Sequence, residues 1–283
     1  MTEQYRPRGF SILPVVVKNL LIINGLMFLA QVVAEKALGI DLADTLGLRY
    51  PGSMAFRPWQ FITYMFLHGN LMHLVFNMFA LWMFGYALEN IWGPKRFLVY
   101  YFITGIGAAL VHYIVIHFQI NPTMVKIDAI IANPSAPAIF DFITNNPLQI
   151  SRYSGEIYSQ SQKFQEALEA LSYNPDNRQA LLMARNFLVD YREYFMNLPN
   201  VIGASGAVFG ILLAFGMIFP NTLIYIYFFF PLKAKYFVIV YGLIELFSGF
   251  TNSESNVAHF AHLGGMIFGF FLILYWKKKG KLF

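Results

Sequence analysis

A serine, several histidines and an asparagine lie inside otherwise apolar stretches, and their types could support acyl-transfer chemistry. Ser205 stands among small residues in "IGASGAVFG", which covers 202–210. A serine hydroxyl attacks a carbonyl when a neighbouring base takes its proton, and His262 could be that base. The resulting oxyanion needs hydrogen-bond donors, which His73, Asn77 and the Ser205 backbone N–H could supply.

These residues fall at similar heights along their apolar stretches. Ser205 and His262 each lie 14 residues before the end of their stretch, and His73 lies 15 residues before the end of its own. At 1.5 Å per helical residue, all three are about 21–22 Å from those ends. Glu89 and Glu245 lie nearer span ends, so we expect a Ser–His dyad without a carboxylate.

The composition predicts an all-α polytopic membrane protein. Of the 283 residues, 57% are hydrophobic and only 12% are charged, whereas a soluble domain carries about 25% charged residues. No cysteine is present, which excludes disulfides and thiolate chemistry. No cleavable signal peptide is expected. Six membrane-spanning helices are predicted, at 14–34, 70–88, 97–118, 203–219, 236–250 and 257–276.

Basic residues beside these spans predict the orientation of the chain. Lys and Arg gather at the two termini and in the loops between spans two and three and between spans four and five, as Arg6, Arg8, Lys18, Lys95, Arg96, Lys233, Lys235, Lys277, Lys278, Lys279 and Lys281. By the positive-inside rule both termini are cytoplasmic, including the segment 1–13. The net charge of +5 then reflects membrane topology, and no nucleic-acid partner is expected.

The segment 119–200 differs in composition and is predicted to be an extracytoplasmic insertion between spans three and four. It holds 6 basic and 8 acidic residues, and prolines at 122, 134, 137 and 147 predict an irregular first half. Its second half predicts two amphipathic helices that are broken at Asn174-Pro175. The apolar stretch 221–235, which contains Pro231, is expected to be a loop at the cytoplasmic face.

Three motifs on separate spans resemble a known family. "GASG" at 203–206, "HLVFN" at 73–77 and "AHLGG" at 261–265 are similar in type and order to the signatures of rhomboid intramembrane serine proteases. The resemblance implies a six-helix rhomboid-like bundle over 14–283, interrupted by 119–200. It also implies that Ser205 is the nucleophile, that His262 is the base, and that His73 and Asn77 bind the oxyanion.

Other positions are assigned by spacing or by the resemblance. Glycine at 203 and 206 would allow a tight turn and the close approach of a substrate backbone. Residues expected beside the substrate are Gly203, Gly206, Phe209, His259 and Trp59. Phe209 stands where some family members carry a tyrosine that packs on the catalytic histidine. Gln60 replaces an arginine that often follows the tryptophan, and His68 matches a recurrent structural histidine.

The resemblance implies cleavage of single-pass transmembrane proteins within the lipid bilayer, near its outer face. Span five and the loop Ser248–Asn256 would form a movable gate and cap. Neither metal nor cofactor is expected, and the expected location is a bacterial inner membrane.

Three other interpretations are compatible with parts of the pattern. Ser205 and the spacings Gly206–Gly210 and Gly265–Gly269 are also typical of close helix packing. A catalytically silent relative that binds membrane proteins is the main alternative, although such relatives usually lack the serine or the histidine. A transport or metal site would use four histidines, namely His68, His73, His259 and His262, but no carboxylate is expected to accompany them.

Overall fold

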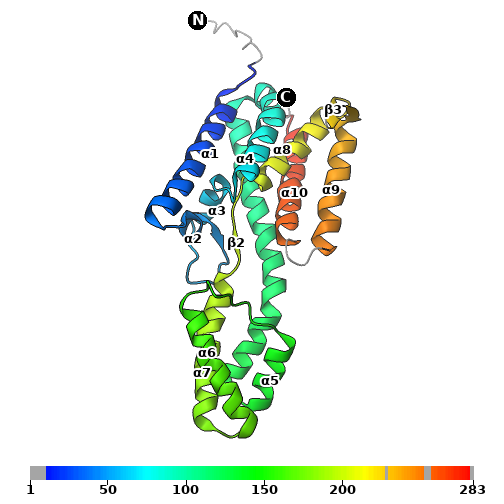
Figure 1. Ribbon diagram of the computed structural model, residues 1–283. Coiled ribbons are helices and arrows are strands. Elements are labelled where there is room, and N and C mark those ends of the chain that lie inside the picture. The colour runs from blue at the N-terminus through cyan, green and yellow to red at the C-terminus, as the bar shows by residue number, and fades with distance from the viewer. Residues whose placement is uncertain (1–10, 227–228, 252–255, 281–283) are drawn as a thin grey trace, which may run out of the picture. The chain divides into compact units, whose positions relative to one another are not determined.

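A computed structural model describes residues 11–226, 229–251 and 256–280, and the chain in these ranges is mainly helical (Figure 1). It divides into two compact units. The first unit comprises Met1–Leu48, Arg57–Val115 and Val201–Phe283. The second comprises Arg49–Phe56 and Ile116–Asn200. The predicted insertion 119–200 therefore falls within one compact unit.

The first unit holds most of the helices. Its elements are α1 (Val15–Val33), a π-helical turn (Ala34–Leu38), α2 (Leu42–Leu46), α3 (Gln60–Thr63), a 3-10 turn (Tyr64–Phe66), α8 (Ser205–Ile218), α9 (Ala234–Thr251), α10 (Asn256–Lys278) and the strands β3 (Leu223–Ile226) and β4 (Phe230–Lys233). The segment α4 (Leu71–Ala132), which holds two helices that meet at Gly93, contributes residues to both units. The short strands β1 (Leu48–Arg49) and β2 (Asn200–Val201) lie where the chain passes between the units.

All six predicted ranges contain helix, but not all of the helices are long. Among the described residues, four helical segments have the length and composition needed to cross a bilayer, at Val15–Leu38, Leu71–Ala132, Ala234–Thr251 and His259–Lys278. The helix α8 is apolar but has only 14 residues, where about 20 are needed to span the hydrocarbon core. That the chain crosses a membrane six times stays a prediction.

The label α4 covers two helices, which meet at Gly93, where the backbone is not helical and φ is +76°. The predicted ranges 70–88 and 97–118 lie on either side of this residue. Glycine adopts this conformation without the steric cost that a side chain would carry. Gly93 lies two residues before the basic pair at 95 and 96 that was expected to join two spans. The second helix continues 14 residues beyond the predicted end at Phe118, to Ala132.

The helix α8 is the buried centre of the first unit. It packs against both α9 and α10, and all but four of its 14 residues are buried. A helix that is apolar on every side is typical of a protein core or of a membrane span. Figure 1 shows α8 among the other helices of this unit, and Ser205 is its first residue.

Glycines allow the helices around α8 to approach closely. A Cβ added at Gly206 would lie 2.4 Å from the Ala108 side chain of α4, and one at Gly265 would lie 1.8 Å from the Gly206 carbonyl oxygen. A Cβ at Gly210 would lie 2.6 Å from Thr104. No side chain fits at such distances, so the packing interpretation of these glycines is confirmed.

Glu89 of α4 caps the first turn of α1. Its two carboxylate oxygens accept the backbone N–H groups of Val16 and Val17, at 2.9 and 2.8 Å. The first N–H groups of a helix have no acceptor within the helix, and they attract negative charge. Glu89 is therefore a structural residue that joins α4 to α1.

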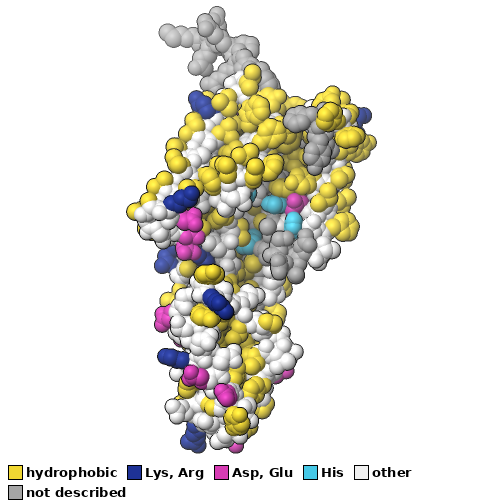
Figure 2. Space-filling view, in the orientation of Figure 1, with side chains coloured by type: hydrophobic (Ala, Val, Ile, Leu, Met, Phe, Trp, Pro, Cys, Tyr) yellow, Lys and Arg dark blue, Asp and Glu magenta, His cyan; other side chains and the backbone are white. Residues whose placement is uncertain are grey.

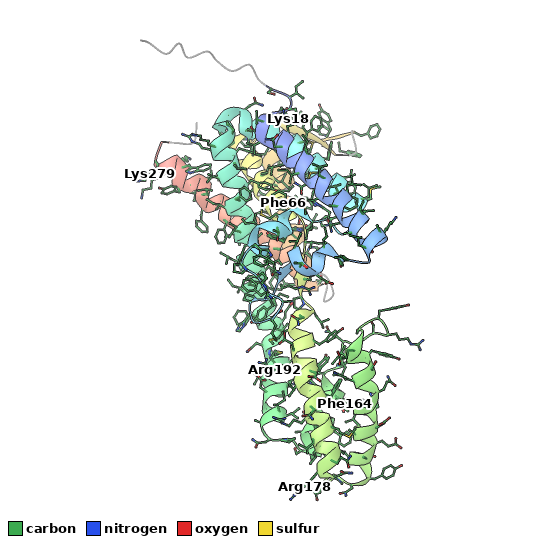
Figure 3. All side chains as sticks on the ribbon, turned by 90° about the vertical axis from the view of Figure 1, so that its left-hand side faces the viewer. Lys18, Phe66, Phe164, Arg178, Arg192 and Lys279 are labelled. Carbon is green, nitrogen blue, oxygen red and sulfur yellow. The ribbon has the colours of Figure 1, made fainter. Side chains whose placement is uncertain are left out.

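The surface of the first unit fits an apolar environment. Large hydrophobic side chains are exposed along α1 and α9, including Leu26, Ile239 and Phe247. Figure 2 shows hydrophobic side chains over the visible face of these helices, whereas the second unit shows charges of both signs. Lys18 and Lys279 lie at the same end of the first unit (Figure 3), as the positive-inside argument requires. Arg6, Arg8 and Lys281, which support the same argument, lie outside the described residues.

The stretch 221–235 is a β-hairpin, where a loop was expected. The strands β3 and β4 pair antiparallel, with Leu223 opposite Lys233 and Tyr225 opposite Pro231. Pro231 lacks an N–H group and is tolerated in a two-stranded ribbon because one edge of each strand needs no partner.

The second unit is built largely from three further helices, α5 (Ala136–Asn145), α6 (Glu156–Tyr173) and α7 (Arg178–Asn197). The expected break near Asn174-Pro175 is confirmed, since α6 ends at Tyr173 and the Asn177 side chain caps α7. Phe164 of α6 stacks on Phe187 of α7 with ring centroids 4.2 Å apart (Figure 3). The amphipathic pattern predicts such a contact, because it places apolar side chains on one face of each helix.

The expectation of an irregular first half for 119–200 is wrong for 119–132 and 136–145, which are helical, and right for the connections 133–135 and 146–155. The helix α4 runs through Pro122, and its buried side chains recur at helical spacing, as Ile120, Met124, Ile127 and Ile130. This packing outweighs the hydrogen bond that the proline removes. Pro137 lies in the first turn of α5, where the lost N–H has no acceptor within the helix. Pro134 and Pro147, by contrast, lie in the non-helical connections after α4 and after α5.

Candidate active site

Ser205 is the first residue of α8 and follows a glycine turn. Gly203 has φ of +131°, and its N–H donates to the Tyr64 carbonyl at 2.9 Å. A Cβ at Gly203 would lie 2.9 Å from the His73 ring. Position 203 therefore needs glycine both for its backbone conformation and for space. The start of α8 also presents backbone N–H groups that have no acceptor within the helix, including that of Ser205.

His262 of α10 contacts the serine directly. Its Nε2 lies 2.8 Å from Ser205 Oγ. The Phe209 ring, one turn along α8 from Ser205, stacks on the imidazole with a centroid distance of 4.2 Å and an interplanar angle of 6°. The expected stacking of Phe209 is thus observed, and it restricts rotation of the ring that faces the hydroxyl.

A carboxylate also reaches His262, contrary to the expectation of a dyad without one. Glu245 of α9 is buried, and its Oε2 lies 2.9 Å from His262 Nδ1. The same oxygen lies 2.7 Å from His259 Nδ1. One carboxylate oxygen therefore contacts two imidazoles, and one of these imidazoles contacts Ser205.

Counting residues along the helices did not predict Glu245 as a partner of His262, because the height of each residue was counted from the predicted end of its span. The helix α9 starts at Ala234, two residues before its predicted start, so Glu245 lies 11 residues inside it. This corresponds to about 16 Å along the helix, and the length of a glutamate side chain covers the remaining difference. The usable signal was the residue type itself, because an ionisable residue inside an apolar helix suggests function by default.

His73 is placed to donate a hydrogen bond beside the serine. Its Nδ1 accepts the Gly69 N–H at 3.3 Å, so in the neutral ring the proton is on Nε2. That Nε2 lies 2.9 Å from the Cβ position built at Gly203, and Ser205 Oγ lies 3.6 Å from the same position. The N–H of His73 is therefore on the side of the ring that faces the nucleophile.

Asn77 lies one turn further along α4 and is buried. Its amide nitrogen donates one hydrogen bond to the His73 carbonyl, at 3.0 Å, and an amide group has a second N–H to offer. Asn77 and His73 both line a cavity of about 350 Å³ between α4, α8 and α9. The other residues that line it are mainly apolar, namely Phe76, Phe79, Ala80, Met83, Phe84, Val208, Phe209, Leu212, Phe237 and Tyr241.

The remaining predicted residues divide between the site and its supports. Gly206 serves helix packing, and His259 contacts Glu245 rather than Ser205. Trp59 is half exposed next to α3, and no hydrogen bond or ring contact among the described residues joins it to Ser205 or His262.

Gln60 and His68 support the first loop. Gln60 accepts the Arg57 N–H and donates to the Thr45 carbonyl, both at 3.1 Å. His68 is buried, and its ring lies edge-on to the His73 ring at 5.0 Å. The structural role expected of His68 fits this position.

Ligand types suited to a metal ion meet in one place. Among the described residues, Glu245, His259 and His262 place potential ligand atoms within 4.8 Å of one another. The expectation that no carboxylate accompanies the histidines is therefore wrong. In the structure these same atoms contact one another and His262 also contacts Ser205, so the group is internally satisfied.

Comparison with protein families agrees with this arrangement. The rhomboid-domain family model matches residues 55–123 and 180–279, which is more than half of the chain and includes the four residues Ser205, His262, His73 and Asn77. The chain belongs to the rhomboid family. The stretch between the matched regions coincides with much of the second unit.

Individual rhomboid relatives match parts of the chain. The rhomboid protease AarA of Providencia stuartii is 44% identical over 52 residues, or 18% of each chain. The rhomboid protease GlpG of Salmonella paratyphi A is 31% identical over 96 residues, or 32% of this chain and 34% of GlpG. An uncharacterized mitochondrial rhomboid protein of Schizosaccharomyces pombe is 25% identical over 238 residues, or 79% of this chain and 53% of the relative. The matches therefore span only part of each relative.

Proposed function

We propose that this rhomboid is an intramembrane serine endopeptidase that uses Ser205 as the nucleophile and His262 as the base. The observation that carries the proposal is the 2.8 Å contact between Ser205 Oγ and His262 Nε2. A histidine within hydrogen-bond distance of a serine at a glycine turn is the arrangement that activates a hydroxyl. The named proteases among the relatives support the same reaction class.

The reaction then follows in two balanced stages. Ser205 Oγ bonds to the substrate carbonyl carbon while its proton passes to His262 Nε2. When the C–N bond breaks, the imidazolium returns that proton to the leaving amine, which produces an acyl-enzyme. Water then gives a proton to His262 and attacks the ester, and the proton finally returns to Ser205 Oγ as the acid product leaves.

The oxyanion that forms in both stages needs donors fixed in advance. The Ser205 backbone N–H at the start of α8, the His73 ring N–H and the free amide N–H of Asn77 are suited to this role. Such donors act strongly where water is excluded, and removing one commonly costs about 10²–10³ in kcat.

Single-pass transmembrane proteins are the proposed substrates, in contact with the lipid bilayer. The cavity beside His73 and Asn77 is lined by apolar side chains of α4, α8 and α9, which suits an unwound apolar segment more than a polar peptide. Gly203 and Gly206 flank Ser205 in the sequence, and we place them beside the substrate backbone. Span five and the loop Ser248–Asn256 would open this path, although residues 252–255 of that loop lie outside the described chain.

The proposed topology has six spans within 14–283, with both termini cytoplasmic and 119–200 on the outer side. The segment 1–13 would then be cytoplasmic, although only its last three residues are described. The common end of Lys18 and Lys279 supports this orientation (Figure 3). We propose a bacterial inner membrane as the location, and the mitochondrial relative makes an organelle membrane the alternative.

Ser205→Ala tests the proposal against a silent membrane-protein-binding role. Purified enzyme is treated with a fluorophosphonate probe and, separately, with a reporter substrate that has one transmembrane segment. We expect Ser205→Ala to lose labelling and to reduce cleavage by 10³-fold or more, because the nucleophile is removed. The matched control is Ser172→Ala, whose hydroxyl is exposed on the second unit and donates to Glu169. Labelling or cleavage that persists in Ser205→Ala would overturn the assignment.

A further inference from the structure

Glu245 is an ionisable residue on the apolar helix α9, and its side chain is buried. Only 5% of the residue is accessible, and its Oε2 lies 2.9 Å from His262 Nδ1 and 2.7 Å from His259 Nδ1. A buried carboxylate is costly unless its charge is met by hydrogen bonds. Two imidazole contacts on one oxygen meet that requirement.

These contacts determine which nitrogen of His262 can act as a base. An ionised carboxylate only accepts hydrogen bonds, so the nitrogen that contacts Glu245 must carry a proton. In the neutral imidazole the other nitrogen, Nε2, is then a lone-pair acceptor, and it faces Ser205 Oγ at 2.8 Å. Without the carboxylate, either nitrogen could hold the proton, and a proton on Nε2 would prevent the ring from accepting the serine proton.

We infer that Glu245 is a positioning residue that converts the Ser205–His262 pair into a three-residue relay. This inference rests on the proposed protease function. The carboxylate holds the Nδ1–H tautomer of His262 and stabilises the imidazolium that forms once the serine proton has been transferred. It touches neither the substrate nor the reacting atoms, and it acts only through His262. Phe209 stacks on the same ring, so the imidazole is held at its face and at its Nδ1 edge.

His259 anchors the carboxylate from the other side. It lies on α10 one turn before His262, so both imidazoles approach the same oxygen of α9. A purely structural explanation would be that Glu245 only fastens α9 to α10. The two roles require different side chains. Holding α9 against α10 needs only a side chain that forms hydrogen bonds. The relay needs an ionised carboxylate, which accepts hydrogen bonds and cannot donate them.

Glu245→Gln separates these two roles. Glutamine keeps the size of the side chain and its capacity to bond both rings, but its N–H₂ group can donate to His262 Nδ1 and so place the proton on Nε2. In the serine–histidine–aspartate triad, replacing the carboxylate by an amide lowers kcat strongly. We therefore expect kcat of Glu245→Gln to fall by about 10²–10⁴, with KM within threefold.

Two further variants give this test its controls. Glu245→Asp keeps the carboxylate and should retain at least tenfold more activity than Glu245→Gln. Thr144→Val removes a polar group from α5 of the second unit, where the exposed hydroxyl donates to the Phe140 carbonyl at 2.8 Å, and should behave as wild type. Wild-type kcat in Glu245→Gln would overturn the inference while leaving the protease assignment intact.

A spectroscopic measurement covers the case in which Glu245 variants do not fold. Wild-type enzyme labelled with ¹⁵N-histidine is studied by NMR at neutral pH, and the His262 signals are assigned by their loss in His262→Ala. The inference requires a protonated Nδ1 and an unprotonated Nε2, and the reverse tautomer would overturn it. A wild-type enzyme that neither cleaves the substrate nor reacts with the probe would instead refute the proposed function. The tautomer of His262 can be measured whether or not the enzyme is active.

Discussion

The closest approach between α8 and α10 predicts that one added methyl group will separate the nucleophile from its base. A Cβ at Gly265 would lie 1.8 Å from the Gly206 carbonyl oxygen. A carbon and a carbonyl oxygen in favourable contact are about 3.3–3.6 Å apart. Gly265→Ala therefore forces the two helices apart by roughly 1.5 Å at this point.

That separation acts directly on the catalytic pair. Gly206 follows Ser205 in the sequence, and Gly265 lies three residues after His262, on the same face of α10. The 2.8 Å contact between the serine and the histidine would then be lengthened beyond hydrogen-bond reach. A misplacement of about 1 Å can cost 10²-fold in rate, and overpacking of this kind costs about 1–3 kcal/mol of stability.

The assay combines the rate of fluorophosphonate labelling with thermal unfolding in detergent. For Gly265→Ala we expect labelling at least 10²-fold slower than wild type, and a loss of about 2 kcal/mol lowers Tm by roughly 4–8 °C in a chain of this size. Gly25→Ala is the matched control, because Gly25 lies within α1 and a Cβ there meets no atom within 4 Å. Alanine favours a helix by about 0.5–1 kcal/mol over glycine, so this control should be as stable as wild type or slightly more so.

The comparison refutes the packing argument if Gly265→Ala labels at the wild-type rate and unfolds at the wild-type temperature. A fall in Tm with normal labelling would show that the helices separate elsewhere and that the serine and histidine are not coupled to this contact. An equal effect in both glycine variants would show that the helices respond to any added methyl group, and that the close approach has no special role.

Two further predictions follow from the same helices. Phe209→Leu removes the ring that stacks on His262, a contact worth about 0.5–1.5 kcal/mol, so kcat should fall by roughly 2–10-fold. Phe209→Tyr should keep the stacking and serves as the control. An unchanged kcat in Phe209→Leu would contradict the expected restraint on the His262 ring. Glu89→Ala leaves the first N–H groups of α1 without acceptors and should reduce stability by about 1–3 kcal/mol. Thermal unfolding measures this loss, the exposed Glu35→Ala serves as its control, and equal Tm values in the two variants would speak against the capping role.

The positions of helices were largely predictable because they follow from local properties of the chain. Long apolar runs cannot leave their backbone groups unpaired in a membrane, so each of the six runs was expected to be helical, and helices occur in all six ranges. The two amphipathic helices of the second unit were predictable from the spacing of their apolar residues, which is also a local property of the chain. Pro122 misled the prediction because packing of the apolar face of α4 outweighed a local preference against helix.

The four residues Ser205, His262, His73 and Asn77 were identified by residue type and spacing, since a polar residue is rare inside an apolar helix. Their heights could be counted from the chain, because a helix rises by a constant distance per residue. The sequence by itself therefore determined which residues could react and roughly how far along their helices they lie.

Contacts between helices depend on rotation and tilt, which no count along one helix contains. The tertiary structure alone placed Glu245 of α9 against His262 of α10 and directed His262 Nε2 toward Ser205. It also decided that Gly206 and Gly265 meet backbone to backbone. The physical reason is that each contact joins groups on different helices, so it exists only after the packing of small residues has set how closely and at what rotation those helices meet.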